Sequence, residues 1–375
     1  MKRSIAAAAL AALFVGLPGR AATTVDPAVR ETLSAPSSAD REDALYALMR
    51  LHDPLVADDR AIVDRAFLAG IAIERAALLR GVCDRWSPDL TLSRTNTERV
   101  LEALGSVDVD VRSAAIDCID RLPARTATAM RIEQLEHVKG SGLPPQVLRA
   151  VLWSVARDPD ARSTEILRRF AATELRDGSQ FSAITEEGSW LILALAATGT
   201  NFEPMFSDSL KVSAESDYAL KLRLDGIRAA KGDDAALAAV IDTANLAVDR
   251  FLRREAADLI LAMPDARRAK AVLALEGRLD DVDGPLRARI VREISREAAN
   301  ADLATEKMLV HAASDVFPDL RVQAVLGLFD RAAAGTLSVD ALASARRLAE
   351  TENDPLVIAA LRALFAKASK PTASP

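Results

Sequence analysis

The residues that most often carry out catalysis or hold metals are few and widely spaced in this chain. Its three histidines are His52, His137 and His311, and none belongs to an HExxH pair that could bind zinc. Serine does not occur in a GxSxG nucleophile elbow. We therefore expect no catalytic residue, no metal site and no cofactor, and we interpret the histidines as exposed or capping side chains.

Two loops have partial matches to ligand-binding motifs. The segment "GSGLPP" at Gly140 is glycine-rich, but it lacks the Lys–Ser/Thr pair of a phosphate-binding loop. The segment "DVDGP" at Asp281 resembles half of a calcium loop, but its twelfth position is Arg292 instead of glutamate. We interpret both segments as turns between helices.

The N-terminus has the features of an export signal. Lys2 and Arg3 precede an uncharged run of eleven residues, Ile5 to Val15, which is too short to span a bilayer. We place cleavage after Ala21, so that residues 1–21 are the signal peptide. Ala22 is a nearby alternative for the cleavage position. Residues 22–368 then form the folded part and residues 369–375 a disordered tail, and the mature chain is expected to be periplasmic or secreted.

The remaining composition favours an all-helical protein that does not bind nucleic acid. Half of the residues are hydrophobic, Ala and Leu are common, and only 4% are aromatic. The formal charge is −6, and removal of Lys2, Arg3 and Arg20 with the signal makes it −9. An acidic chain lacks the clustered cations that bind nucleic acids and anionic membranes. No later segment is apolar and long enough to span a membrane.

A pattern recurs along the chain with a period of about 35 residues. The segment "VDVRSAAIDCIDRL" from Val109 resembles "PDLRVQAVLGLFDR" from Pro318. In both, apolar residues stand three, four and seven places after an arginine, which puts them on one face of an α-helix. We call the arginine position the anchor. The anchors are Arg41, Arg75, Arg112, Arg149, Glu187, Arg223, Arg253, Arg287, Arg321 and Val357.

A second helix fits between successive anchors, as in "DARSTEILRRFAATEL" (Asp160–Leu175) and "SVDALASARRLAET" (Ser338–Thr351). A helix pair of this length whose second helix begins Asp/Pro–x–apolar–Arg–x–x–Ala resembles a HEAT repeat, in particular the short bacterial HEAT-like kind. The resemblance covers about Arg41 to Leu364. It implies an all-α chain forming an α-solenoid, a superhelix of about ten HEAT-like helix pairs. We expect a single elongated body.

A cation in the first turn of a helix opposes the helix dipole, so arginine at most anchors implies a compensating acid or a ladder of carbonyls between units. HEAT repeats carry a ladder of Asp–Arg pairs, and the resemblance implies one here, while a row of ligand-binding arginines is the alternative. The candidate ladder arginines are Arg41, Arg75, Arg112, Arg149, Arg223, Arg253, Arg287 and Arg321. The candidate acids are Asp108, Asp110, Asp249, Asp283 and Asp319.

Two further pairs of residues could carry a specific role. Trp153 and Trp190 lie at core offsets of neighbouring units, so we expect interior packing, with a shallow groove on the concave face as the alternative. Cys83 and Cys118 are 35 residues apart, about one unit. An oxidising compartment permits a disulfide between them, but the direction of stacking decides whether the thiols face each other. We favour two buried free thiols over the bond.

The sequence predicts a binding protein and no enzyme. An exported α-solenoid offers a long concave surface, so we expect a protein–protein interaction scaffold that binds a peptide or partner protein there. One alternative is an accessory subunit or inhibitor of an exported enzyme. Another is an enzyme with a carboxylate or metal site in the curve. The sequence names neither the partner nor an oligomeric state.

Overall fold

The computed structural model describes residues 25–51, 56–84, 92–141, 144–157, 161–174, 186–198, 218–261, 263, 265–296 and 303–369. The predicted signal peptide lies outside these residues, as does the predicted tail except for Ser369. Within them the secondary structure is helical and no strand occurs, so the protein is all-α. No described helix combines the length and apolar character that crossing a membrane requires.

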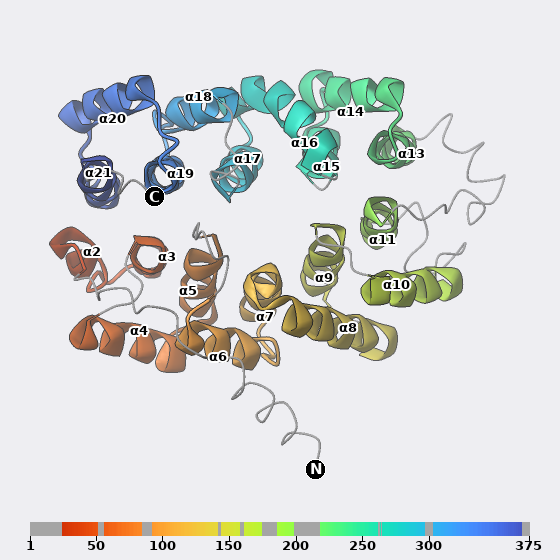
Figure 1. Cartoon of the computed structure of the whole chain (residues 1–375), viewed down its shortest axis with the longest axis horizontal. Helices are drawn as coiled ribbons and strands as arrows, with labels where there is room; N and C mark the ends of the chain where they lie inside the picture. Colours follow the sequence, from red (N-terminus) through yellow and green to blue (C-terminus); the bar gives the residue numbers. More distant parts are fainter. Residues whose placement is uncertain are drawn as a thin grey trace, which may run out of the picture.

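The anchors all fall within helices, and these helices form an inner layer (Figure 1). The inner helices are α3 (Ser38–Leu51), α5 (Ala72–Asp84), α7 (Val109–Asp117), α9 (Pro145–Arg157), α11 (Glu186–Ala197), α13 (Tyr218–Ala230), α15 (Arg250–Leu261), α17 (Gly284–Arg296), α19 (Pro318–Ala334) and α21 (Pro355–Ala368). Each packs against the next one along the chain.

Figure 1 also shows an outer layer of helices, which covers the outside of the inner helices. It contains α4 (Ala57–Ala69), α6 (Arg94–Ala103), α8 (Ala124–Ser141), α10 (Ala161–Glu174), α14 (Asp234–Leu246), α16 (Asp265–Val272) with the 3-10 helix η3 (Leu273–Asp280), α18 (Leu303–Ala312) and α20 (Val339–Thr351). The short helix α2 (Pro27–Thr32) precedes α3, and the 3-10 turn η1 (Ile119–Arg121) follows α7.

Local sequence signals set several helix ends. Ser338 begins α20 by accepting a hydrogen bond from the backbone N–H of Ala341, and Asp354 caps α21 just before Pro355. Helix α19 ends at Gly335, whose φ of 74° lies in the left-handed region that favours glycine. These caps place the turns between helices where the repeat predicts them.

The predicted helix face forms the core. The residues three places after the anchors are all buried, from Ala44 in α3 to Ala360 in α21. The residues four and seven places after the anchors are also buried, except for Ala230, which is partly buried. The side chains of Trp153 and Ala156 are not among those that the structure describes. The apolar face of the repeat is therefore confirmed as the face that packs.

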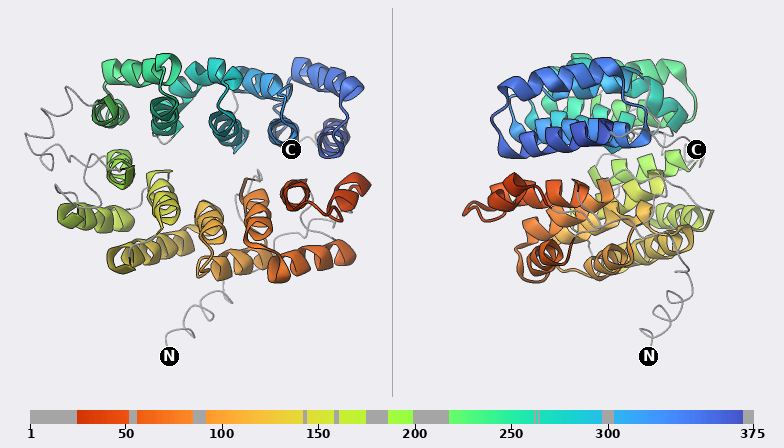
Figure 2. Two further views of the ribbon diagram at one scale, coloured as in Figure 1. Left: turned by 180° about the vertical axis from the view of Figure 1, so that it is seen from behind. Right: turned by 60° about the vertical axis from the view of Figure 1, so that its left-hand side comes forward.

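The inner helices form two rows that face each other (Figure 2). Helices α3 to α11 belong to one row and α13 to α21 to the other. The first and last described helices meet, since α21 packs against α2 and α3, α19 packs against α3, and α17 contacts α5. The concave side of the expected elongated body is therefore covered where these helices touch. The reason is that the inner helices carry complementary charges, which the apolar repeat pattern does not report.

Candidate functional site between the two helix rows

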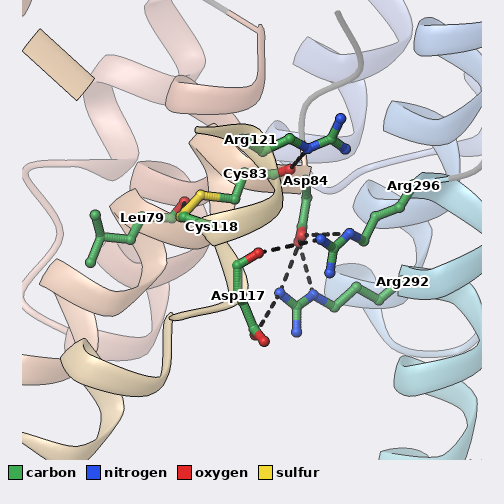
Figure 3. Close-up of a disulfide and its surroundings, with 8 residues drawn as sticks. All are labelled: Leu79, Cys83, Asp84, Asp117, Cys118, Arg121, Arg292 and Arg296. Atoms are coloured by element: carbon green, nitrogen blue, oxygen red, sulfur yellow. Dashed lines mark hydrogen bonds and ion pairs between the residues drawn. A yellow bond between two sulfur atoms is a disulfide. The ribbon is translucent and has the colours of Figure 1, made fainter. Parts of the chain in front are cut away.

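One group of charged residues joins α3, α5 and α7 of one row to α17 and α19 of the other, and we call it the closing cluster. It consists of Tyr46, Arg50, Asp84, Asp117, Arg292, Arg296 and Asp330. Arg50 of α3 donates to Asp330 of α19 over 2.8 Å. Arg292 of α17 donates to both carboxylate oxygens of Asp84 in α5, at 2.9 and 3.2 Å, and to Asp117 in α7 at 3.3 Å (Figure 3).

Burial makes these charges strongly interacting. Asp84 and Arg50 have no exposed surface, and Asp330 is 1% exposed. Burial acts to raise the pKa of Asp84, but Arg292 and Arg296 outweigh it and hold that pKa below its usual value. Burial and the nearby Asp84 carboxylate raise the pKa of Tyr46 to about 12. The cluster is therefore a set of paired ions, which joins the rows.

A disulfide lies directly behind this cluster. Cys83 and Cys118 are bonded, with a Cα–Cα separation of 5.1 Å, and both residues are fully buried. The favoured expectation of two free thiols is wrong, because α5 and α7 stack so that their C-terminal ends approach each other. Each cysteine is next in sequence to a carboxylate of the closing cluster, Asp84 or Asp117. Figure 3 shows Arg292 and Arg296 reaching these carboxylates beside the disulfide.

In the C-terminal row the anchor arginines bind the following unit. Arg253 donates to both oxygens of Asp281 at 3.0 and 3.2 Å, and to the carbonyls of Ala247 and Val248 at 2.9 Å. Arg321 repeats this arrangement with Glu352 and with the carbonyls of Asp315 and Val316. Arg287 lies 2.8 Å from Asp315. Arg223 pairs with Glu255.

The N-terminal row is less regular. Arg41 donates to Glu74 at 2.8 Å and to the carbonyls of Ala35 and Pro36. Arg75 lies 3.7 Å from Asp108. Arg112 donates to the amide oxygen of Gln134, at 2.7 and 3.1 Å, instead of to a carboxylate. Arg149 crosses to Asp258 of α15 at 3.3 Å, and among the described residues of its own row it has no carboxylate partner.

Most of the candidate acids were wrongly chosen. Among the described residues Asp108 alone of the five pairs with a candidate arginine, and it belongs to the unit after that arginine. Asp283 pairs with Arg254, Asp249 accepts from the backbone of Phe251, and Asp110 and Asp319 form no ion pair with the ladder. The acids that do pair stand 28 to 33 residues after their arginine: Glu74, Asp108, Glu255, Asp281, Asp315 and Glu352. That spacing is the signal which would have found them.

A second charged group between the rows surrounds a cavity of about 510 Å³. We call it the Arg–Trp pocket. The guanidinium of Arg149 lies over the ring of Trp190, 4.5 Å from its centroid, and Trp190 is buried. Asp258 pairs with both Arg149 and Arg289. The lining residues are Arg149, Trp190, Arg223, Phe251, Arg254, Glu255, Asp258, Pro285, Leu286 and Arg289.

Acidic residues gather where α3 meets α19 and α21, around a cavity of about 850 Å³. Burial, followed by the charges of Asp319, Glu42 and Asp354, raises the pKa of Asp43 to about 7. Burial also raises the pKa of Glu42. In the described part of the chain no group of three or more His, Cys, Asp or Glu side chains has the arrangement to hold a metal ion.

Of the tryptophans, the histidines and the "DVDGP" turn singled out in the sequence, only Trp190 and Pro285 of that turn belong to one of these groups among the described residues. Trp190 lines the Arg–Trp pocket, whereas the side chain of Trp153 lies outside the description. His52 also lies outside it, as does the side chain of His137 in α8. His311 is exposed and lies 2.8 Å from Asp280. The "DVDGP" segment forms the turn between η3 and α17.

Comparison with known proteins supplies no family. No protein-family model matches the chain, and no curated protein is similar to it in sequence. One engineered protein solved by a structural genomics consortium is 15% identical, with a TM-score of 0.32, and the match covers 91% of this chain and 98% of that one. A second engineered protein is 15% identical, with a TM-score of 0.30 and coverage of 72% and 97%. Similarity at these TM-scores carries no argument about fold or function.

Proposed function

We propose that this chain is an exported HEAT-like α-solenoid of about ten helix pairs that acts as a protein-interaction scaffold. The serial packing of the inner helices supports the architecture, as do the anchor arginines that bind the following unit. The charged n-region and short apolar run before Ala21 support export. The proposed binding function rests on exposed apolar side chains that the packing of the core does not require.

That surface is a row of exposed apolar side chains, one in each of three successive turns. Val248, Val282 and Val316 each stand five places before an anchor arginine and are 96%, 94% and 80% exposed. The backbone carbonyls of Val248 and Val316 accept hydrogen bonds from those arginines, which fixes the turns. Since α15, α17 and α19 pack side by side, the three turns that carry these valines follow one another in the same order as the helices. This row is the observation that carries the proposal.

Two of these three valines also lie close in sequence to residues of the Arg–Trp pocket. Phe251 and Pro285 line that pocket and follow Val248 and Val282 by three residues, within the first turns of α15 and α17. The inner faces of α3 and α19, and of α5 and α17, are joined by ion pairs of the closing cluster. We therefore place the partner protein on the row of valines and at the mouth of the pocket, instead of along an open concave face.

A capture experiment with a matched control tests this. Tagged protein is incubated with the exported fraction of its source cells, beside a variant with Val248→Asp, Val282→Asp and Val316→Asp. The control is Leu68→Asp, because Leu68 is 75% exposed on the outer helix α4. We expect the wild type and the control to retain one partner that the triple variant loses. All three should have the same helical circular dichroism spectrum, since exposed valines contribute little to folding.

Two outcomes would contradict the proposal. One is a triple variant that retains the partner as well as the wild type does. The other is a wild type that captures nothing beyond what the triple variant captures. If the captured partner is a single stoichiometric enzyme whose rate changes on binding, the chain acts as an accessory subunit or inhibitor, which is a narrower form of the same scaffold role.

A further inference from the structure

The Arg–Trp pocket holds more positive than negative charge. Four guanidinium groups line it, from α9, α13, α15 and α17, against the two lining carboxylates of Glu255 and Asp258. Asp283, which pairs with the lining Arg254, adds a third carboxylate and leaves one positive charge in excess. The pocket therefore attracts an anion, although the whole chain is acidic. Its walls also include the apolar surfaces of Trp190, Phe251 and Leu286. A ligand that fits both features carries a negative group on an apolar or aromatic body.

The hydrogen bonds show which arginines retain donors for such a ligand. Arg254 donates through two nitrogens to Asp283, and Arg223 does the same with Glu255. Arg149 and Arg289, in contrast, each donate through a single nitrogen to one shared carboxylate, that of Asp258. A guanidinium has several further N–H donors. Among the described residues these remaining donors of Arg149 and Arg289 have no acceptor.

The geometry of this pair is held in place without a ligand. The guanidinium of Arg149 lies 4.5 Å from the ring centroid of the buried Trp190, which helps to hold its position. Asp258 is 7% exposed and holds Arg149 and Arg289 close together from opposite rows. Two guanidinium groups presented together match the two oxygens of a carboxylate, which they can bind in a bidentate manner.

We propose that the Arg–Trp pocket binds a carboxylate borne on an aromatic or apolar group, with Arg149 and Arg289 as its direct ligands. The carboxylate comes either from the C-terminus of a partner protein or from a free aromatic acid, and only the first source rests on the proposed scaffold function. Trp190, Phe251 and Leu286 contact the apolar body, and Asp258 orients the two arginines.

Binding of three probes to the full mature chain tests this and separates the sources. The probes are acetyl-Ala-Ala-Phe with a free carboxylate, the same tripeptide as its C-terminal amide, and phenylacetate. Calorimetry and tryptophan fluorescence are recorded at low ionic strength, where screening is weak. We expect the free tripeptide to bind about tenfold or more tightly than its amide. Tighter binding of the tripeptide than of phenylacetate assigns the site to a peptide terminus, and equal binding assigns it to a free acid.

Variants locate the binding in the pocket. Arg149→Gln and Arg289→Gln should each weaken the free tripeptide about tenfold or more. Arg346→Gln should leave it unchanged, because Arg346 is exposed on α20. Melting curves verify that the variants are folded. Equal affinity of acid and amide, or unchanged affinity in a folded Arg289→Gln protein, would overturn the proposal. The capture result with the triple valine variant does not depend on these binding measurements. The scaffold proposal and the pocket proposal can therefore fail separately.

Discussion

The closing cluster and the Arg–Trp pocket both consist of arginines and carboxylates that meet between the two rows, yet they differ in balance and in burial. The closing cluster has three arginines and three aspartates, and Arg50, Asp84 and Asp330 are at most 1% exposed. In the pocket four arginines face two carboxylates, and the side chains of Arg149 and Arg289 are 29% and 31% exposed. Balanced, buried charge joins the rows, whereas unbalanced, accessible charge is available to a ligand.

The largest expected effect comes from unbalancing the closing cluster. Asp84→Ala removes the fully buried carboxylate that pairs with Arg292 and Arg296, whose partly buried charges then lose their main partner between the rows. We expect a loss of about 3–5 kcal/mol in the free energy of unfolding, measured by urea denaturation. As the control, Arg50→Met with Asp330→Leu removes both members of a pair and should change stability much less. An Asp84→Ala protein as stable as the wild type would mean that the cluster does not hold the rows.

The next effect concerns the disulfide behind that cluster. Breaking the Cys83–Cys118 bond frees a loop of 35 residues, so the free energy of unfolding should fall by about 3–4 kcal/mol on the chain-entropy estimate. Denaturation with and without a reductant measures the loss. The double variant Cys83→Ala, Cys118→Ala is the control and should not respond to the reductant. Two reactive thiols per chain in the denatured, unreduced protein would exclude the bond.

A smaller effect is expected at Asp43, which lies among acidic residues beside the closing cluster. Its pKa of about 7 in the folded state lies above the ordinary value of 3.8, so the folded state binds a proton that the unfolded state releases. The contribution of Asp43 to the free energy of unfolding should therefore be greatest below about pH 4 and should fall as the pH rises through 7. Asp43→Asn should remove on the order of 1–3 kcal/mol of this decline, allowing for solvent screening.

The pH experiment compares unfolding free energies of wild type and Asp43→Asn between pH 4 and 8. Because other carboxylates titrate in both proteins, the difference between the two curves is the quantity that reports Asp43. It should rise in favour of the variant as the pH increases. A constant difference across this range would contradict the raised pKa.

The repeat made one part of this molecule predictable. Ala324 and Leu328 could be assigned to the core because burial on one helix face leaves a period in the sequence. The ladder arginines could be placed for the same reason. Their acids were missed because each lies about one unit later, as Glu74 does after Arg41, and such a spacing is visible only once the direction of stacking is known.

The contacts between the rows could not be predicted in this way. Arg50 and Asp330 are 280 residues apart, and a single pair at that distance leaves no periodic signal. The same holds for Arg292 with Asp84 and for Arg149 with Asp258. The disulfide remained open because the sequence places the two cysteines on a helix wheel without fixing the direction of stacking. The candidate site is thus made mostly of residues whose partners only the tertiary structure identifies.

The smallest expected change in stability has the clearest consequence for binding. Asp258→Asn keeps the size of the side chain but removes the charge shared by Arg149 and Arg289. Because both arginines are partly exposed, the loss of stability should stay below about 1 kcal/mol. The pocket becomes more positive, so the affinity for the free tripeptide carboxylate should rise about three- to tenfold at low salt and by less at high salt. Asp258 orients both arginines, and the amide oxygen of the substituted asparagine can still accept a hydrogen bond from one of them. Weaker binding in a folded Asp258→Asn protein would therefore mean that the lost orientation outweighs the gained positive charge. The same charge removal at Asp84 should destabilise the fold, and that contrast is the sharpest test of the difference between the two clusters.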